Sequence, residues 1–183
     1  MKGFIKPVEH WRPLVVATLN VYWPSLEPEW VLSMIEQESL GNVAAVSRVG
    51  AQGLMQLMPA TGREVGVMDP FDPNQNIRGG IQYLHRQYRN LSHVWYVTDR
   101  LFWSMAAYNG GLGYVRKALQ LARFEQTHGQ DADSGSWDGN KHYLQHPSCT
   151  VTIDGRVRRP DSAQIIGYVD TIRERHRRAT SDA

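Results

Sequence analysis

The sequence predicts a mainly α-helical domain with one small β-hairpin near its C-terminus. Apolar residues recur with the 3.6-residue period of a helix in one segment after another, and strands do not alternate with helices as in a parallel sheet. Asp154-Gly155 lies between two short β-prone runs, which is a strong signal for a two-residue hairpin turn. The 183 residues are the length of one domain, and we expect residues 1–183 to form one.

Two helices and a loop are expected in the first sixty residues. Apolar residues of the segment 11–22 follow a helical period, and a second helix is expected over about 28–40, where Gly41-Asn42 supplies helix-ending chemistry. The glycine-containing residues 41–53 predict a structured loop. Pro59 then suits the first turn of a short helix.

Four more helices are expected beyond this loop. Asp72 is a candidate N-cap of a long helix whose apolar stripe continues to Leu91. The later helices are expected over about 99–108 and 114–124, and from Asp161 or Ser162 to an arginine-rich end.

Glu38 is a carboxylate on the apolar face of its helix. Residues three, four and seven apart share a helical face, so Glu38 joins Val31, Met34 and Ile35, whereas Glu36 is expected on the solvated side. Burial raises the pKa of a carboxyl group, and an acid that is still protonated near neutral pH can donate its proton to a leaving group. The periodicity by itself favours an ordinary alternative, a buried glutamate paired with an arginine or capping a backbone group.

Two further stretches have an unusual composition. In residues 50–61 the glycines allow a ligand to approach the backbone, Met55 and Met58 offer pliable apolar contact, and Gln56 offers a donor and an acceptor. This mixture suits an uncharged polymer rich in hydroxyl and amide groups. At the end of the helix over 99–108, the phenol of Tyr108 could reach a cleft where the chain turns. By themselves these patterns favour core packing and an ordinary helix end.

Together, in this order and spacing, the motifs resemble those of the SLT-type lytic transglycosylases, which have the goose-type-lysozyme-like fold of glycoside hydrolase family 23. The family's Glu-Ser at a helix end, Gly-Leu-Met-Gln and Ala-Tyr-Asn are similar to Glu38-Ser39, Gly53-Leu54-Met55-Gln56 and Ala107-Tyr108-Asn109. The run over residues 72–77 also looks like the segment that precedes the family's long helix. The resemblance covers residues 30–116 and extends weakly to Tyr168-Val169. It implies a lysozyme-like, mainly α fold.

The resemblance also implies a role for seven residues. By this resemblance Glu38 is the catalytic acid, and Ser47 contacts the acetamido group of the substrate. Met55 and Gln56 line the groove. Tyr108 and Asn109 position the acid and the sugar, and Tyr168 is a late tyrosine near the acid.

The family cleaves the β-1,4 bond between N-acetylmuramic acid and N-acetylglucosamine in peptidoglycan, so the resemblance implies that Glu38 acts as general acid and then as base. The motifs hold no second acid on the face of Glu38, and the acetamido oxygen of the substrate would stabilise the charge at the anomeric carbon. Deprotonation of the 6-hydroxyl of muramic acid would give the 1,6-anhydro end of a lytic transglycosylase, which we favour. Deprotonation of water would make the chain a lysozyme. A chitinase on the same fold and a non-catalytic peptidoglycan-binding or assembly module are the alternatives.

Three features depart from the family pattern. Residues 109–113 read Asn-Gly-Gly-Leu-Gly where the family has Asn-Ala-Gly-Pro-Gly, and we expect a looser loop there. Gln164 stands where an acid often precedes the late tyrosine. The variable segment and hairpin over about 124–160 have no recognised counterpart and could rim the groove. Within that segment, the Gly-, Asp- and Ser-rich residues 128–141 are expected to be mobile.

The composition limits which metals, cofactors and macromolecules the chain is expected to bind. The single cysteine, Cys149, allows no intrachain disulfide and no four-cysteine zinc site. His142, His146 and Cys149 form a weak metal-site candidate interrupted by Pro147, and we expect neither a metal nor a cofactor. The net charge of +2 does not by itself indicate nucleic acid. We expect a monomer that binds peptidoglycan glycan strands.

The arginine-rich C-terminal helix is expected to have a solvated end. A weak attraction to an anionic envelope is the functional alternative, and it would be salt-sensitive. A helical nucleic-acid binder that uses these arginines would lose affinity steeply with salt, but it would leave Glu38, Gln56 and Tyr108 without a purpose.

The first residues lack the continuous apolar region of a signal peptide, because charged residues and two prolines interrupt it. No apolar run is long enough to cross a membrane. We therefore expect a chain made in a host cytoplasm without a Sec signal, which reaches the wall after the inner membrane is permeabilised. This setting is that of a bacteriophage endolysin, and a virion-associated or secretion-linked enzyme is the alternative.

Overall fold

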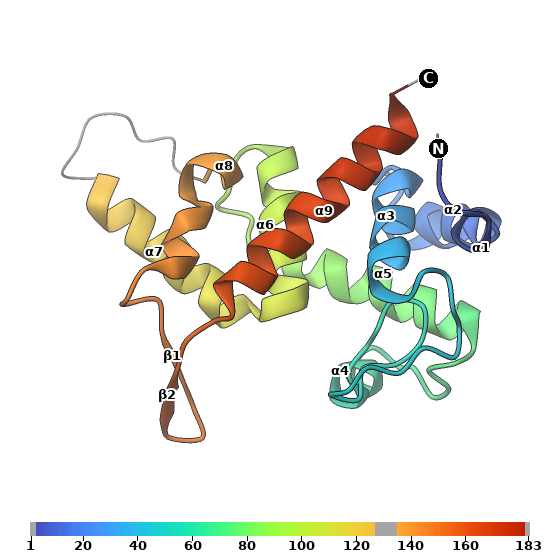
Figure 1. The fold of residues 1–183 in the computed structure, drawn as a ribbon, viewed down its shortest axis with the longest axis horizontal. Helices are drawn as coiled ribbons and strands as arrows, with labels where there is room; N and C mark the ends of the chain where they lie inside the picture. The colour runs from blue at the N-terminus through green and yellow to red at the C-terminus, as the bar shows by residue number, and fades with distance from the viewer. Residues whose placement is uncertain (1–2, 127–134, 182–183) are drawn as a thin grey trace. The chain divides into compact units, whose positions relative to one another are not determined.

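The computed structural model describes residues 3–126 and 135–181, and these are mainly helical (Figure 1). The chain divides into two compact units. The first takes the residues up to His85 together with those from Asp170 onward, and the second is Arg86–Val169. The long helices α5 (Pro73–Asn90) and α9 (Ser162–Thr180) each contribute residues to both units. The prediction of one domain over residues 1–183 stays a prediction.

Helix α3 (Pro28–Ser39) is the central element of the first unit and packs against α1 (Lys6–Glu9) and α2 (Arg12–Tyr22). Val31, Leu32, Met34 and Ile35 of α3 are fully buried, so this packing stabilises the unit by removing apolar surface from water. The helices predicted over 11–22 and 28–40 are thereby confirmed. The short helix predicted from Pro59 is α4 (Pro59–Glu64), whereas α1 was not predicted.

Helix α5 begins where the sequence predicts. Asp72 Oδ1 accepts hydrogen bonds from the backbone amides of Asn74 at 2.7 Å and Gln75 at 3.1 Å, which satisfies amides that have no partner within the helix. These bonds hold the pKa of the Asp72 carboxyl below its usual range. The predicted stripe is buried at Ile77, Ile81 and Leu84 of α5 and at Leu91 directly after the helix, whereas Tyr88 is half-buried.

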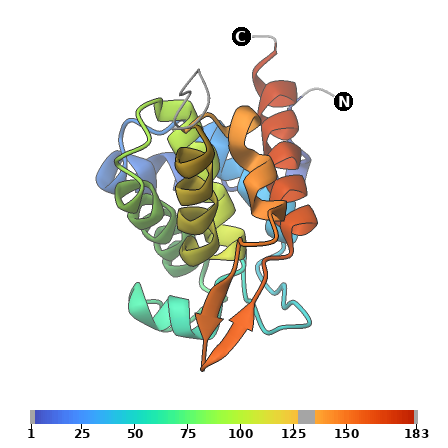
Figure 2. The ribbon, with the colours of Figure 1, turned by 90° about the vertical axis from the view of Figure 1, so that its left-hand side faces the viewer.

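In the second unit, helix α6 (Val97–Gly110) packs against α7 (Leu112–Gln126) and α8 (Trp137–Asn140), and the 3-10 helix η1 (Lys141–Gln145) packs against α7. The strands β1 (Val151–Ile153) and β2 (Arg156–Arg158) pair antiparallel and project from these helices as a hairpin (Figure 2). Asp154 and Gly155 form its turn with φ angles of 50° and 73°, as the sequence predicts.

The predicted mobility of residues 128–141 is wrong for the part that the structure describes; residues 128–134 lie outside it. Trp137 is fully buried, and its ring meets that of Trp103 edge to face at 4.8 Å between centroids. The Trp103 indole donates to the carbonyl of Gly135 at 2.8 Å, and the Trp137 amide donates to Asp99 Oδ1 at 2.8 Å. Burial of Trp137 therefore orders this segment although the composition around it is typical of a mobile loop.

The expected looser loop after Asn109 is also wrong. Helix α6 continues to Gly110, and Gly111 alone separates it from α7. Gly111 has a φ of 102°, and its amide donates to the carbonyl of Ala107 at 2.9 Å. A Cβ on Gly110 would overlap the side chain of Ile165, so the small residue allows α9 to pack closely on the end of α6.

Candidate active site

Glu38 lies half-buried in the last turn of α3, and the helix ends one residue later at Ser39. Leu40 takes a left-handed conformation with a φ of 53°, and Gly41 follows with a φ of 81°. A Cβ on Gly41 would lie 2.6 Å from the carbonyl oxygen of Pro7, so only glycine fits there. The Gly41 carbonyl accepts a hydrogen bond from the Trp11 indole at 3.1 Å. The helix end that carries Glu38 is therefore fixed by the segments at the start of the chain.

Ser39 connects this helix end to the Gly-Leu-Met-Gln turn. Its Oγ lies 2.9 Å from the carbonyl oxygen of Leu54 and 3.2 Å from that of Ile35, and it accepts from the amide of Gly41 at 3.2 Å. The serine after Glu38 therefore acts as a structural link, which joins the turn to the end of the helix that carries Glu38.

Asn76, in the first turn of α5, holds the other side of that turn. Its buried side chain accepts from the amide of Met55 at 2.8 Å and donates to the carbonyls of Gln52 at 3.1 Å and Pro70 at 2.8 Å. A Cβ on Gly53 would overlap both Asn76 and the Pro70 carbonyl, which explains the glycine. Sequence reasoning noticed the run over 72–77 but missed Asn76 as a positioning residue; the signal was a polar residue on the buried stripe of a helix.

The prediction that Met55 lines a groove is wrong, because this residue is fully buried. A Cβ on Gly80 of α5 would overlap the Met55 side chain, so a glycine makes room for the methionine in the core. Met55 thus follows the core alternative that its pattern favours, whereas Met58 is exposed.

The side chain of Gln56 stabilises the turn itself. It has a φ of 46°, and its Nε2 donates to the carbonyls of Gly53 at 2.8 Å and Ala45 at 3.1 Å. Both protons of the amide group are thereby directed to the loop, and Oε1 is the atom left to accept from a ligand. Contact between Gln56 and substrate stays a prediction.

Ser47 is half-buried in a tight turn. Its Oγ accepts from the amide of Ala51 at 3.0 Å, and its own amide donates to the carbonyl of Ala51 at 2.9 Å. Next to this turn, Gln52 forms backbone bridges with Val46 and Leu57, which order the loop. The hydroxyl proton of Ser47 is not used by the bond from Ala51, so it can serve another acceptor.

The expectation that Glu36 is solvated is wrong. Glu36 is only 4% exposed, and its carboxylate accepts from Arg178 Nη2 at 2.8 and 3.1 Å and lies 3.3 Å from Arg175 Nη1. The arginines come from the C-terminal helix and cover the side of α3 opposite Glu38. The same contacts correct the expectation of a solvated C-terminal end at these two arginines, whereas Arg177 is exposed and pairs with Glu174. Attraction of this end to an anionic envelope stays a prediction.

The remaining predicted residues belong to the second unit. Tyr108 and Asn109 are half-buried in the last turn of α6, and Tyr168 is buried on α9. Gln164 Nε2 lies 3.5 Å from Asn109 Oδ1, so the residue at the position of the missing acid contacts the candidate asparagine. That these three residues act together with Glu38 stays a prediction.

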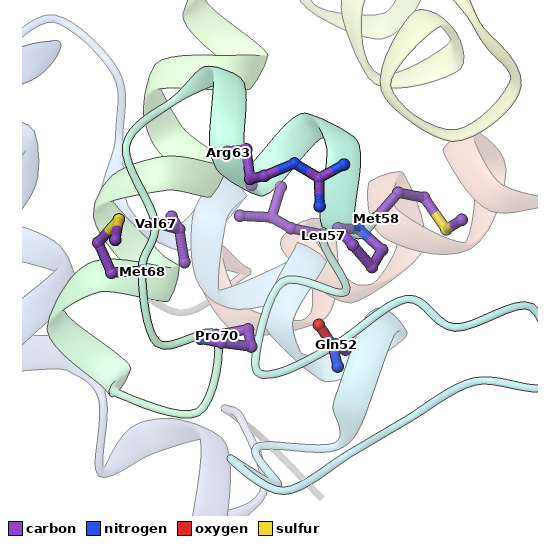
Figure 3. A pocket seen from close by; sticks show the side chains of 9 residues that line it. Gln52, Leu57, Met58, Arg63, Val67, Met68 and Pro70 are labelled. Carbon is purple, nitrogen blue, oxygen red and sulfur yellow. The ribbon is translucent and has the colours of Figure 1, made fainter.

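Each unit carries a pocket. A pocket of about 350 Å³ in the first unit lies between the turn and α4, and Met58 lines it (Figure 3). A pocket of about 320 Å³ in the second unit is lined by Asn90, His93, Arg116, Leu119, Gln120 and Arg123. Burial and the charges of Arg123, Arg116 and Arg100 lower the pKa of His93.

Among the residues that the structure describes, no group of three His, Cys, Asp or Glu side chains could hold a metal ion. His146 lies 3.4 Å from the carboxylate of Glu125, and burial raises the pKa of the Cys149 thiol. Within the same residues, no helix has the length and apolar character that crossing a bilayer requires.

Comparisons with known proteins agree with the motifs. The family model described as Transglycosylase SLT domain matches residues 21–129, more than half of the chain. Similar sequences include proteins named membrane-bound lytic murein transglycosylase F from Vibrio cholerae and Shewanella pealeana. They are 32% and 33% identical over 176 residues and match 94% of this chain. The chain spans about a third of the length of these relatives, 32% and 35% respectively.

Solved structures share the fold. An inactive variant of the lytic transglycosylase Slt from Pseudomonas aeruginosa matches with a TM-score of 0.63 and 24% identity, over 90% of this chain and 23% of that one. The 70 kDa soluble lytic transglycosylase of Escherichia coli matches with a TM-score of 0.58 and 24% identity, over 93% of this chain and 25% of that one. The predicted fold class is confirmed, and the chain belongs to the SLT family of transglycosylases.

Proposed function

We propose that the chain cleaves the β-1,4 bond between N-acetylmuramic acid and N-acetylglucosamine in peptidoglycan as a lytic transglycosylase. Glu38 acts as the general acid and then as the base. The observation that carries this proposal is the fixed end of α3 in a chain of the SLT family: Ser39 links the residue after Glu38 to the turn of the second family motif. A catalytic group held by such contacts meets its substrate with little loss of conformational freedom.

In the first step the Glu38 carboxyl donates its proton to the glycosidic oxygen. The bond between this oxygen and the anomeric carbon breaks, and the acetamido oxygen of the same muramic acid bonds to that carbon. Negative charge is least favoured in the C-terminal turn of a helix, which supports Glu38 as a proton donor. The hydroxyl of Ser47 is proposed to hold the acetamido group.

In the second step the ionised Glu38 accepts the proton of the 6-hydroxyl of muramic acid. The oxygen of that hydroxyl attacks the anomeric carbon, the acetamido oxygen leaves, and a 1,6-anhydro end forms without consumption of water. Tyr108, Asn109 and Tyr168 are proposed to position the sugar and the acid during both steps. No metal or cofactor takes part in this scheme.

Mass spectrometry of the fragments released from purified sacculi tests the proposal. Wild-type chain is expected to release fragments with anhydro ends, and Glu38→Gln is expected to release none while it still binds sacculi. Reducing ends would make the chain a hydrolytic lysozyme. Cleavage of chito-oligosaccharides that lack muramic acid would favour a chitinase, and the absence of fragments with wild-type chain would favour a binding module.

We further propose that the chain is a monomer and that it lyses cells as a phage endolysin does. The proposed activity supports this role, because glycan cleavage weakens the wall. Cells that make the chain in their cytoplasm should keep their turbidity until the inner membrane is permeabilised and should then lyse. Lysis before permeabilisation, or a dimer in light scattering, would contradict these two points.

A further inference from the structure

The pocket of the second unit has a basic lining. Arg116 and Arg123 lie two turns apart on α7 and therefore on the same face of the helix, and Leu119 lies between them as a buried apolar floor. His93, from the segment that joins α5 to α6, adds a third basic group. Two carboxamide side chains complete the lining, which contains no acidic side chain among the described residues.

The two arginines of this pocket have no anion to pair with in the part of the chain that the structure describes. Neither Arg116 nor Arg123 forms a hydrogen bond or an ion pair there. Two acids of the same unit are engaged elsewhere. Asp99 accepts from the amide of Trp137 at 2.8 Å, and the carboxylate of Glu125 lies 3.4 Å from His146 Nε2. The positive charge of the pocket is therefore left without an internal counter-charge from these groups.

The pKa of His93 shows that these charges act on one another. Burial and the charges of Arg123, Arg116 and Arg100 lower it, because a further positive charge is disfavoured beside three others. The segment that carries His93 is held in place by Arg100, whose Nε donates to the carbonyl of Val94 at 2.7 Å and whose Nη2 donates to that of Ser92 at 3.2 Å. A bound anion would relieve this repulsion.

The donors of the pocket suit a phosphate group. Guanidinium groups present forked N–H donors that match phosphate oxygens, and two of them balance the double negative charge of a phosphomonoester better than the single charge of a carboxylate. Lys117 Nζ lies 3.5 Å from Gln120 Oε1, which leaves the amide protons of Gln120 to face a ligand. The volume of about 320 Å³ is at the small end of ligand pockets, and Leu119 offers apolar contact, so a small organic group can accompany the phosphate.

We propose that this pocket binds a phosphomonoester, carried by a small soluble molecule or by the headgroup of an anionic lipid. Arg116 and Arg123 pair with the phosphate oxygens, Asn90 and Gln120 donate from their carboxamides, and the organic group contacts Leu119. The inference does not rest on the proposed function, because all of these residues belong to the second unit and none is a candidate catalytic or glycan-binding residue.

Calorimetric titration of the full chain with glycerol 3-phosphate at pH 7 and constant ionic strength tests the proposal, with glycerol as the uncharged control. Arg116→Gln and Arg123→Gln are each expected to weaken binding about fivefold, since the arginines are exposed and water screens part of their contribution. Arg158→Gln removes the same charge from an exposed position on β2 and is the matched control, which should bind as the wild type does. Circular dichroism checks that all three variants are folded.

Two further measurements identify the site and the source of the ligand. The pKa of His93, followed by NMR of its ring protons, should rise when glycerol 3-phosphate is bound, because the dianion offsets the arginines. Co-sedimentation with phosphatidylcholine vesicles that contain phosphatidic acid tests the headgroup. Binding to these vesicles alone, lost in Arg116→Gln but kept in Arg158→Gln, would assign the phosphate to a lipid.

Three results would overturn the inference. The first is an absence of binding to both glycerol 3-phosphate and the phosphatidic acid vesicles. The second is an equal loss of binding in Arg116→Gln and Arg158→Gln, which would show a response to net charge instead of a site. The third is a pKa of His93 that stays unchanged when the phosphomonoester is bound.

Discussion

Glu36 is expected to stabilise the fold without taking part in catalysis, and Glu36→Gln tests this directly. The substitution keeps the size of the side chain and removes its charge. Burial lowers the pKa of Arg175, and Glu36 opposes that effect. Without the carboxylate, Arg175 and Arg178 would be two neighbouring cations with no anion between them, and the free energy of unfolding should fall.

The size of the loss follows from the burial of the three side chains. Removal of one partner from a fully buried ion pair costs about 3–5 kcal/mol. The side chain of Glu36 is 6% exposed, but those of Arg175 and Arg178 are 19% and 38% exposed, so water screens part of the loss. We therefore expect a decrease of about 2–3 kcal/mol in the free energy of unfolding, which corresponds to a fall in Tm of roughly 5–10 °C for a chain of this length.

Thermal unfolding followed by circular dichroism measures this change. A double-mutant cycle with Arg178→Gln isolates the coupling between the two side chains, and the double variant should lose less than the sum of the single losses. Per folded molecule, Glu36→Gln should keep its activity on sacculi. A Tm equal to that of the wild type, or a loss of activity at a temperature where the variant is folded, would refute the assignment of Glu36 to stability.

Three other outcomes are expected. Asn76→Ala leaves the buried amide of Met55 without an acceptor, so urea unfolding should show a loss of about 2–4 kcal/mol, and wild-type stability would contradict its positioning role. Burial and the charges of Arg123, Arg116 and Arg100 lower the pKa of His93 in the folded chain. As the pH falls, His93 is therefore protonated in the unfolded chain before it is protonated in the folded chain. Its contribution to stability is therefore present above the unfolded pKa of about 6.5 and is lost as the pH falls below it. Between pH 7 and 5.5, the free energy of unfolding should fall less for His93→Gln than for the wild type. Equal falls in the free energy of unfolding for the two chains would count against this. The thiol of Cys149 is buried with a raised pKa, so a disulfide reagent should modify it only as fast as the chain unfolds, and rapid modification of folded chain would be inconsistent with its burial.

Local signals predicted most of the fold. Asp72 caps its helix, and Asp154-Gly155 turns the hairpin, because both features depend on residues that are neighbours in the chain. Contacts between distant segments were predicted poorly. The helical period placed Glu36 opposite Glu38 correctly, but it could not show that arginines about 140 residues later cover that side.

The same limit applies to the candidate site. Sequence motifs identified the segment around Glu38 and the turn over 53–57, whereas the roles within the turn depend on α5. Met55 is buried because Gly80 makes room for it, and Asn76 supports the turn from within a helix. A motif residue can thus support a site from the protein core without contacting the substrate, and the helical period does not distinguish these two roles.

The central claim is that Glu38 carries the proton in glycan cleavage, and the rates of two variants on one helix test it most directly. Release of fragments from sacculi is measured for Glu38→Gln and Glu36→Gln at a temperature where circular dichroism shows both to be folded. We predict that Glu36→Gln cleaves at a rate close to that of the wild type and that Glu38→Gln releases no detectable anhydro fragments. Cleavage by Glu38→Gln at the wild-type rate would contradict the claim.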